Sequence, residues 1–217
     1  MNKNLVEKSS FSQPNKVYIS YNQIHETIRT AVEKSDLIKT FQPTLLLAIS
    51  AGGFLPTRIL RNIIKHYGGK TLPIQTIGIC LYDDDNVDVD FDMRQIRKTQ
   101  WLTYDKNNQL AVNLQGQNIL IVDEVDDTRT TLSYVVNELK HDIDQQRQEK
   151  TTEEWTEPKI GIFVVHNKGK EKRAQLPDEI MKNAYFVGKE VGQEWIVYPW
   201  DAINIEEHTR LAENIIS

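Results

Sequence analysis

Residues 119–132 read ILIVDEVDDTRTTL, and this stretch decides the fold class of the chain. The four apolar residues at its start predict a short strand covered on both faces, because they lack the polar alternation of a half-exposed strand. Acids occupy four of the next five positions, and the residues after them follow the 3.6-residue period of a helix. A buried strand that leads through a short turn into a helix is the repeating unit of an α/β sheet.

Three further apolar runs predict strands of the same kind, at residues 45–49 (LLLAI), 74–81 (IQTIGICL) and 160–165 (IGIFVV). Helical patterns lie between these runs, and their apolar faces are formed by Ile59, Leu60, Ile63 and Ile64 and by Leu132, Val135, Val136 and Leu139. An earlier helix is expected over residues 22–39, with Ile24, Ile28, Ala31 and Val32 facing inward. Strands that alternate with helices predict a parallel twisted sheet flanked by helices.

The remaining segments suggest the domain organisation. Residues 1–16 are polar and are expected to form a flexible N-terminal tail ahead of a core at residues 17–165. Residues 83–100 (DDDNVDVDFDMRQIRKTQ) show no apolar period and predict a long exposed loop of the kind that often acts as a lid. Residues 166–217 are irregular and suggest a small subdomain over one edge of the sheet.

Composition narrows the class of protein. The 217 residues include 26 basic and 31 acidic side chains, a net charge of −5, which argues against nonspecific binding to nucleic acid. The single cysteine, Cys80, excludes an internal disulfide framework and any cysteine-based metal cluster. No apolar run approaches the roughly 20 residues of a membrane span, and residues 1–20 lack a signal-peptide pattern. We therefore expect a soluble cytoplasmic protein with no membrane partner.

The acidic turn is where chemistry is expected, because ligands of open α/β sheets bind beyond the carboxyl ends of the strands. The helix start at residues 128–131 offers unpaired backbone N–H groups to a phosphate, and Asp123 and Glu124 can bind sugar hydroxyls or Mg²⁺. A sugar phosphate would suit both parts of the turn, with its phosphate at the helix start and its hydroxyls at the two acids. The alternative is that Asp127 or Thr128 caps the helix and that the other acids are solvated.

The acidic turn resembles the phosphoribosyl-diphosphate signature of the type I phosphoribosyltransferases. Five further segments, in the same order, resemble the fungal hypoxanthine-guanine and xanthine phosphoribosyltransferases, and the resemblance covers residues 17–212. These segments are YISYNQIH (18–25), GGFLPTRIL (52–60), RKTQW (97–101), FVVHNK (163–168) and WIVYPWD (195–201). The resemblance implies the type I phosphoribosyltransferase fold, with a small C-terminal hood subdomain over the sheet edge.

The resemblance also implies roles for the acidic turn. Asp123 and Glu124 match the pair that binds the ribose hydroxyls and Mg²⁺, and Asp127 matches the general acid or base near purine N7. The loop that holds the 5-phosphate corresponds to Asp127, Thr128, Arg129, Thr130 and Thr131. Two residues depart from the family pattern. Arg129 stands where many members have glycine, and Glu124 replaces the aspartate of the bacterial enzymes.

Other implied roles lie outside the acidic turn. The loop expected to bind pyrophosphate consists of Ser50, Ala51, Gly52 and Gly53, where many relatives have a basic residue in place of Ala51. Paired glycines let the backbone approach an anion, although a helix-packing turn explains them equally well. Tyr82 begins the mobile flap at residues 83–100. The expected purine-binding residues are Lys168 at the 6-oxo group, Trp195 stacked on the ring, Ile196 at the ring edge and Asp201 as a further Mg²⁺ ligand.

The activity implied by the resemblance is transfer of the 5-phosphoribosyl group of phosphoribosyl diphosphate to a 6-oxopurine, hypoxanthine or guanine, in purine salvage. This reaction uses Mg²⁺, gives IMP or GMP with pyrophosphate, and is carried out by relatives that form dimers or tetramers. A xanthine-preferring enzyme that makes XMP and a noncatalytic nucleotide sensor are the alternatives. An aspartyl-phosphate phosphatase is disfavoured, since its D-x-D-x-T signature would place the nucleophile at Glu124, where glutamate stands instead of aspartate.

Overall fold

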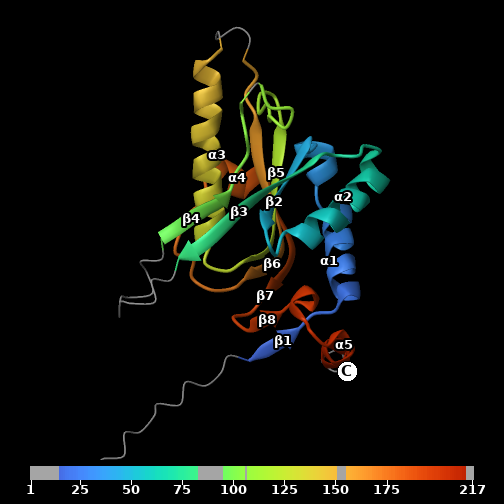
Figure 1. Cartoon of the computed structure of the whole chain (residues 1–217). Helices are drawn as coiled ribbons and strands as arrows, with labels where there is room; N and C mark the ends of the chain where they lie inside the picture. The colour runs from blue at the N-terminus through green and yellow to red at the C-terminus, as the bar shows by residue number, and fades with distance from the viewer. Residues whose placement is uncertain (1–14, 83–94, 106, 151–154, 214–217) are drawn as a thin grey trace, which may run out of the picture. The chain divides into compact units, whose positions relative to one another are not determined.

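The computed structural model describes residues 15–82, 95–105, 107–150 and 155–213. Its main sheet has the strand order β4-β3-β2-β5-β6-β7 (Figure 1). The strands are β2 (Leu45–Ser50), β3 (Ile74–Tyr82), β4 (Gln95–Gln100), β5 (Asn118–Asp126), β6 (Lys159–Lys168) and β7 (Tyr185–Val191). Neighbouring strands are parallel except β3 and β4, which are antiparallel. The carboxyl ends of β2, β5 and β6 therefore meet at one edge of the sheet.

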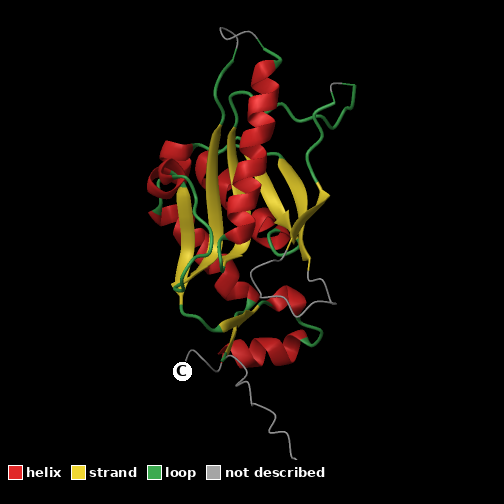
Figure 2. Ribbon diagram, turned by 90° about the vertical axis from the view of Figure 1, so that its left-hand side faces the viewer, coloured by secondary structure: helices red, strands yellow, loops and turns green. Residues whose placement is uncertain are grey.

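Helices cover both faces of this sheet, as its uninterrupted apolar strands require (Figures 1 and 2). The helices α3 (Thr130–Gln148) and α4 (Asp178–Asn183) share one apolar core with alternate residues of β2 and β5. On the other face lie α1 (Tyr21–Lys34), a π-helical turn (Leu37–Phe41) and α2 (Phe54–Gly68). The expected inward faces are buried in all three long helices, apart from the partly exposed Ile59.

The four strands predicted from apolar runs are confirmed, and three other expectations are wrong. The first helix ends at Lys34 instead of residue 39, because a π-helical turn follows it. Residues 95–100 of the predicted loop form β4, an edge strand whose exposed side chains give no apolar signal. Residues 185–191 form β7 and complete the main sheet, although the sequence predicted only an irregular segment there.

A second compact unit joins the two ends of the chain. By spatial contact, residues 1–21 and 193–217 form one unit and residues 22–192 the other. In the small unit, β1 (Lys16–Tyr18) pairs in parallel with β8 (Trp195–Val197), which is followed by a 3-10 turn (Pro199–Asp201) and α5 (Ile205–Glu213). Lys16 belongs to a strand, so the tail predicted through residue 16 is too long, and residues 1–14 lie outside the described ranges.

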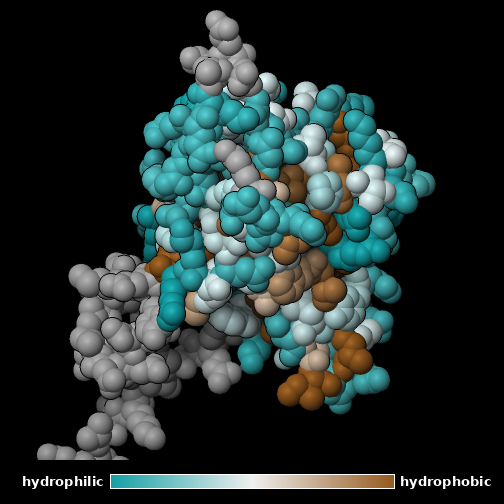
Figure 3. Space-filling model, turned by 45° about the horizontal axis from the view of Figure 1, so that its top comes forward, coloured by the Kyte–Doolittle hydropathy of each residue, from teal (hydrophilic) through white to brown (hydrophobic). Residues whose placement is uncertain are grey.

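Two properties of the surface complete the description. The face shown in Figure 3 is mostly hydrophilic, with smaller apolar areas among the polar side chains. None of the helices in the described part of the chain combines the length and the hydropathy that crossing a bilayer requires.

Candidate active site

Strand β5 carries its acids to the carboxyl edge of the sheet. Asp123 is only 8% exposed, and its Oδ1 accepts a hydrogen bond from the Glu124 N–H at 2.9 Å. Burial, together with the neighbouring charge of Glu124, raises the pKa of Asp123 well above its ordinary value. Two adjacent carboxylates, one of them desolvated, are an environment that a bound cation or hydroxyl donors would stabilise.

The glycine loop (Ser50–Gly53) at the end of β2 lies directly against this carboxylate pair. A Cβ on Gly52 would overlap the carboxylate of Glu124, so a side chain at this position would displace that carboxylate. The sequence-predicted pyrophosphate loop and ribose carboxylates are thus brought together. The peptide bond between Ser50 and Ala51 is cis.

Gly53 has a packing role in the same loop. It is buried, its N–H donates to Ile49 O at 2.9 Å, and its carbonyl accepts from the Thr57 hydroxyl at 2.6 Å. A Cβ on Gly53 would lie 2.5 Å from Val122 O. The expected contact of the Gly53 N–H with pyrophosphate is therefore not available in this conformation. The helix-packing explanation holds for Gly53, and Gly52 is the residue that faces the site.

Mg²⁺ fits the donor set at this edge. Among the described residues, no cluster of three or more histidine, cysteine or acidic side chains could hold a metal by itself. Mg²⁺ commonly takes only one or two carboxylates and completes its shell with water and substrate phosphates. The oxygens of Asp123 and Glu124, beside a loop open to an anion, match that pattern. Asp201, the third expected ligand, belongs to the other compact unit.

Asp127 meets two lysines, one at the end of β6 and one just after it. The Lys168 Nζ lies 3.5 Å from Asp127 Oδ2, and Lys168 is buried at the end of its strand. The Lys170 ammonium forms a second ion pair with Asp127. Sequence analysis singled out Asp127 and Lys168 separately, and the structure makes them neighbours. His166, two residues earlier, is buried in the strand, and burial lowers its pKa to about 4.

The phosphate loop (residues 127–131) continues into α3. The Thr128 and Thr130 hydroxyl oxygens lie 3.0 Å apart, and the Ser133 N–H is the first to bond back into the helix, to Arg129 O. Arg129 adopts the left-handed conformation with φ of 68°, which explains why glycine would suit this position. These features give the loop a helix N-terminus with exposed donors.

A buried acid that sequence analysis left without a role, Asp126, lies beneath this loop. Asp126 Oδ2 accepts from the Arg129 Nε at 2.9 Å and from the Tyr185 hydroxyl at 2.5 Å. The Arg129 guanidinium also lies over the Tyr185 ring, 5.3 Å from its centre. The Nε of Arg129 is therefore committed to Asp126, and burial raises the pKa of Tyr185. No sequence pattern indicates Tyr185, whereas the basic run KGKEKR at residues 168–173 is a signal for the lysines.

The other expected site residues lie farther along the chain. The Tyr82 backbone ends β3, and residues 83–94 of the expected flap lie outside the described ranges. Trp195 and Ile196 lie in β8 and Asp201 in the 3-10 turn of the small unit. Trp195 is 57% exposed, so it is not a core residue of that unit.

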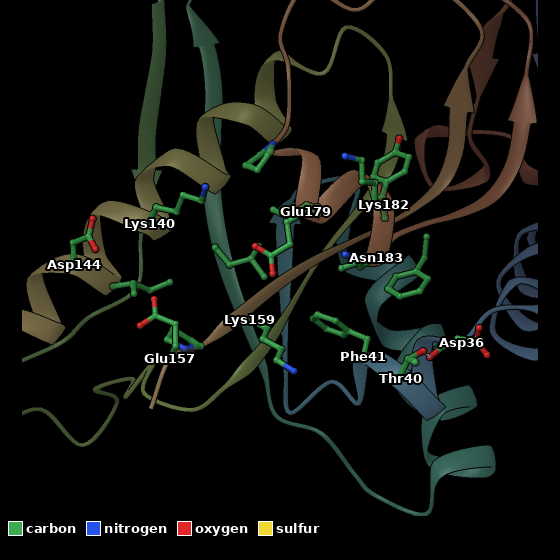
Figure 4. Close-up of a pocket in the computed structure, with 18 of the residues that line it drawn as sticks. Asp36, Thr40, Phe41, Lys140, Asp144, Glu157, Lys159, Glu179, Lys182 and Asn183 are labelled. Carbon is green, nitrogen blue, oxygen red and sulfur yellow. Dashed lines mark hydrogen bonds between the residues drawn. The ribbon is translucent and has the colours of Figure 1, made fainter. Parts of the chain in front are cut away.

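A cavity of about 930 Å³ lies at the opposite edge of the sheet, beside the first residues of β6 and β7 (Figure 4). Four acids and four bases line it: Asp36, Asp144, Glu157, Glu179, Lys140, Arg147, Lys159 and Lys182. None of the sequence-predicted site residues is among its lining residues. The carboxyl edge, where the predicted residues of β2, β5 and β6 gather, is therefore the candidate site.

Comparison with known proteins shows which family the chain resembles. The chain is 46% identical over 197 residues to the hypoxanthine-guanine phosphoribosyltransferase of Schizosaccharomyces pombe, covering 90% of this chain and 93% of the relative. It is 45% identical over 203 residues to xanthine phosphoribosyltransferase 1 of Saccharomyces cerevisiae, covering 91% and 95%. No family model matches the sequence.

One solved structure is both similar in sequence and close in fold. It is a hypothetical protein from Neisseria gonorrhoeae with bound ppGpp, 32% identical, with a TM-score of 0.71 and coverage of 93% of this chain and 98% of that one. The mostly parallel sheet flanked by helices is the type I phosphoribosyltransferase fold. This chain belongs to the purine phosphoribosyltransferases, in the family of the fungal hypoxanthine-guanine and xanthine enzymes.

Proposed function

We propose that this protein transfers the 5-phosphoribosyl group of phosphoribosyl diphosphate to a 6-oxopurine, hypoxanthine or guanine, in purine salvage. The products are IMP or GMP and pyrophosphate. The observation that best supports this proposal is the junction of β5 and α3, where the Asp123–Glu124 pair adjoins a helix N-terminus. Vicinal hydroxyls next to a phosphate are the ligand chemistry that such a junction can bind.

The donor would bind across the two adjacent loops. Asp123 and Glu124 would accept hydrogen bonds from the ribose hydroxyls, and residues 127–131 would hold the 5-phosphate. The glycine loop would meet the pyrophosphate through the N–H groups of Ala51 and Gly52. The approach of Gly52 to Glu124 supports a single ligand that spans both loops.

The purine would bind where Lys168 and Asp127 meet. A 6-oxopurine carries an acceptor at O6 beside a protonated N7, so a lysine donor next to a carboxylate acceptor matches it. Adenine has an amino donor at position 6 and would oppose the Lys168 ammonium. The 3.5 Å separation of the two side chains supports their acting on neighbouring atoms of one ring.

The reaction breaks the bond between C1 of the ribose and the pyrophosphate oxygen, and pyrophosphate leaves with the electron pair. A purine ring nitrogen forms the new bond to C1, and Asp127 accepts the N7 proton, a contribution of about 10²–10⁴-fold. Trp195 is proposed to stack on the purine, with Ile196 at the ring edge. Positioning of both reactants can offset roughly 7–11 kcal/mol of the barrier.

Mg²⁺, held by Asp123 and Glu124 with Asp201 as a further ligand, would supply positive charge to the leaving pyrophosphate when bound. The residues of the chain would align the donor and exclude water, which competes for C1. The flap that begins at Tyr82 is proposed to provide part of this exclusion.

Two alternative functions, a preference for xanthine and nucleotide sensing, are each supported by one relative. The relative in Saccharomyces cerevisiae named xanthine phosphoribosyltransferase 1 favours a preference for xanthine, with XMP as the product. The structure from Neisseria gonorrhoeae with bound ppGpp favours a guanine-nucleotide ligand that binds in competition with the donor, as a nucleotide sensor would use. The presence of both Asp127 and Lys168 supports catalysis over sensing alone.

The wider organisation is proposed on the same resemblance. We propose that the flap lies between β3 and β4, within the predicted segment 83–100, and that the purine-binding residues lie within residues 166–217. We also propose a homodimer, with a tetramer as the alternative, located in the cytoplasm. Light scattering after size-exclusion chromatography measures the oligomeric state directly.

A turnover assay with labelled phosphoribosyl diphosphate and Mg²⁺ tests the function. The panel of bases is hypoxanthine, guanine, xanthine and adenine. We expect nucleotide formation with hypoxanthine and guanine and none with adenine. Preferential use of xanthine would select the first alternative, and tight ppGpp binding without turnover of any base would select the second.

A further inference from the structure

The carbonyl groups of the phosphate loop are held from outside by the turn that follows β6. The Lys172 Nζ donates to Asp126 O at 2.7 Å and to Asp127 O at 3.0 Å. The next carbonyl, Thr128 O, accepts from the Arg173 N–H at 3.0 Å. Three consecutive carbonyls therefore face the same short segment of chain.

The direction of these carbonyls fixes the direction of the N–H groups that follow them. In a planar trans peptide the C=O and the next N–H point in opposite directions. The N–H groups of Asp127, Thr128 and Arg129 must therefore point away from Lys172. Among the hydrogen bonds between backbone groups of the described residues outside regular helices and strands, none has one of these three N–H groups as its donor.

The left-handed conformation of Arg129 adds to this arrangement. Successive N–H groups next to a left-handed residue form a concave anion site, and the α3 N-terminus follows immediately. The conformation is held by Asp126, whose carboxylate binds the Arg129 Nε. The loop thus presents a row of donors whose orientation is set by residues on its other side.

Lys172 itself cannot serve as the phosphate ligand in this geometry. An ammonium group has three N–H donors, and Lys172 uses them on Asp126 O, Asp127 O and, at 2.8 Å, Asn167 Oδ1. The Asp126 carboxylate, 3.4 Å away, balances its charge. Burial lowers the pKa of Lys172, and Asp126 counteracts that effect.

We propose that Lys172 is a positioning residue, which orients the backbone N–H groups of residues 127–129 toward the 5-phosphate without touching the ligand. The inference rests on the proposed function, because it assigns the 5-phosphate to this loop. Its distinctive consequence is that the loss of Lys172 weakens the binding of the phosphate group alone. Binding of the sugar and the purine is left unchanged.

Calorimetric binding of ribose 5-phosphate measures this effect without turnover. We expect Lys172→Met to weaken binding about 10- to 100-fold. Lys172→Arg keeps the charge but cannot place one nitrogen among three acceptors, and it should weaken binding about 3- to 10-fold. Lys182→Met, which removes an exposed lysine paired with Asp178, is the matched control and should bind as the wild type does.

Steady-state kinetics provide a second measurement. In Lys172→Met the KM for phosphoribosyl diphosphate should rise while the KM for the purine stays unchanged. A merely structural role would lower the melting temperature of the variant and leave both KM values unchanged, and this result would overturn the inference.

The calorimetry also separates this inference from the proposed function. Unchanged ribose 5-phosphate affinity in both Lys172→Met and Lys172→Arg would overturn the inference and leave the proposed function standing. Failure of the wild-type protein to bind ribose 5-phosphate would overturn both. If Lys172→Met does not fold, the result with Lys172→Arg decides.

Discussion

The phosphate loop and the glycine loop end neighbouring parallel strands, β5 and β2, yet they are built in different ways. The phosphate loop depends on groups outside it, since Lys172 binds the carbonyls of residues 126 and 127, and Asp126, which also binds the Tyr185 hydroxyl, binds the Arg129 side chain. The glycine loop is stabilised by residues close to it in sequence. The Gly53 N–H donates to Ile49 O, and the Thr57 hydroxyl donates to Gly53 O.

This difference separates two ways of preparing a backbone for an anion. In the glycine loop the requirement is space for the Glu124 carboxylate, which a side chain at Gly52 would displace. In the phosphate loop the requirement is the orientation of the backbone N–H groups. This orientation is supplied by Lys172, which is more than 40 residues away in sequence. Substitutions within the glycine loop should therefore act through steric overlap. The phosphate loop should also respond to substitutions at residues distant in sequence, such as Lys172.

The largest effect is expected at the acid of the phosphate loop. Asp127→Asn should lower kcat about 10²–10⁴-fold, because an amide cannot accept the N7 proton. The affinity for phosphoribosyl diphosphate should change little. Asp144→Asn, at an exposed acid of α3, is the control and should leave both quantities unchanged. Equal losses of kcat and donor affinity in Asp127→Asn would remove the acid–base role.

A pH effect is expected in β6, where His166 pairs in register with Val125 of β5. Burial lowers the folded-state pKa of His166 to about 4, so the unfolded state binds more protons between about pH 6.5 and 4. Stability should therefore fall as the pH decreases through this window, by about 3 kcal/mol in total. Urea unfolding at pH 7 and pH 4.5 measures this loss.

The loss should be smaller in His166→Gln than in the wild type, since the variant has no group to protonate there. His25→Gln, at an exposed histidine of α1, should retain the full dependence. An identical pH dependence in His166→Gln and the wild type would show that His166 does not contribute.

In the glycine loop, Gly52→Ala should lower kcat/KM about 10²-fold, because the new methyl group displaces the Glu124 carboxylate and misplaces the ribose. Gly68→Ala, at the last residue of α2, meets the side chains of Ile38 at 3.3 Å and Ile64 at 3.9 Å, away from the candidate site, and should retain activity. Wild-type kinetics in Gly52→Ala would contradict a steric role for this glycine.

The base specificity should depend on Lys168. Lys168→Ala should raise the KM for the 6-oxopurine about tenfold, through loss of a charged hydrogen bond, with donor affinity nearly unchanged. Lys159→Ala removes an exposed lysine at the other end of β6 and serves as the control. If the purine KM stays constant in Lys168→Ala, the base pocket is assigned to the wrong residue.

The smallest effect is expected at Arg129 of the phosphate loop, where substitution by glycine introduces the residue type that the glycine loop uses. Both Arg129→Gly and Arg129→Ala remove the hydrogen bond from the Arg129 Nε to Asp126. Only glycine adopts a φ of 68° without steric cost. The free energy of unfolding of Arg129→Gly should therefore be about 1 kcal/mol higher than that of Arg129→Ala. Equal stabilities would mean that the loop changes conformation once the arginine is lost.

The sequence predicted the parts of the molecule that depend on local patterns. Apolar runs located β2, β3, β5 and β6, and the acidic turn indicated the candidate site, because runs of apolar or acidic residues can be read directly from consecutive positions. The edge strands β4 and β7 were missed, since a half-exposed strand carries no continuous apolar run.

The missed site residues have the same physical explanation. Tyr185 and Lys172 act through contacts with Asp126 and its neighbours that only the folded chain creates. The parallel pairing of β1 with β8 was also unpredictable, because it joins segments near opposite ends of the chain. Gly53 was assigned to a ligand, whereas its N–H is used within its own turn.

The most direct test of this account is a crystal structure with bound GMP. The account predicts ribose hydroxyls against Asp123 and Glu124, and phosphate oxygens within hydrogen-bond distance of the N–H groups of residues 127–131. A nucleotide bound at any other place, such as the cavity at the opposite edge of the sheet, would contradict it.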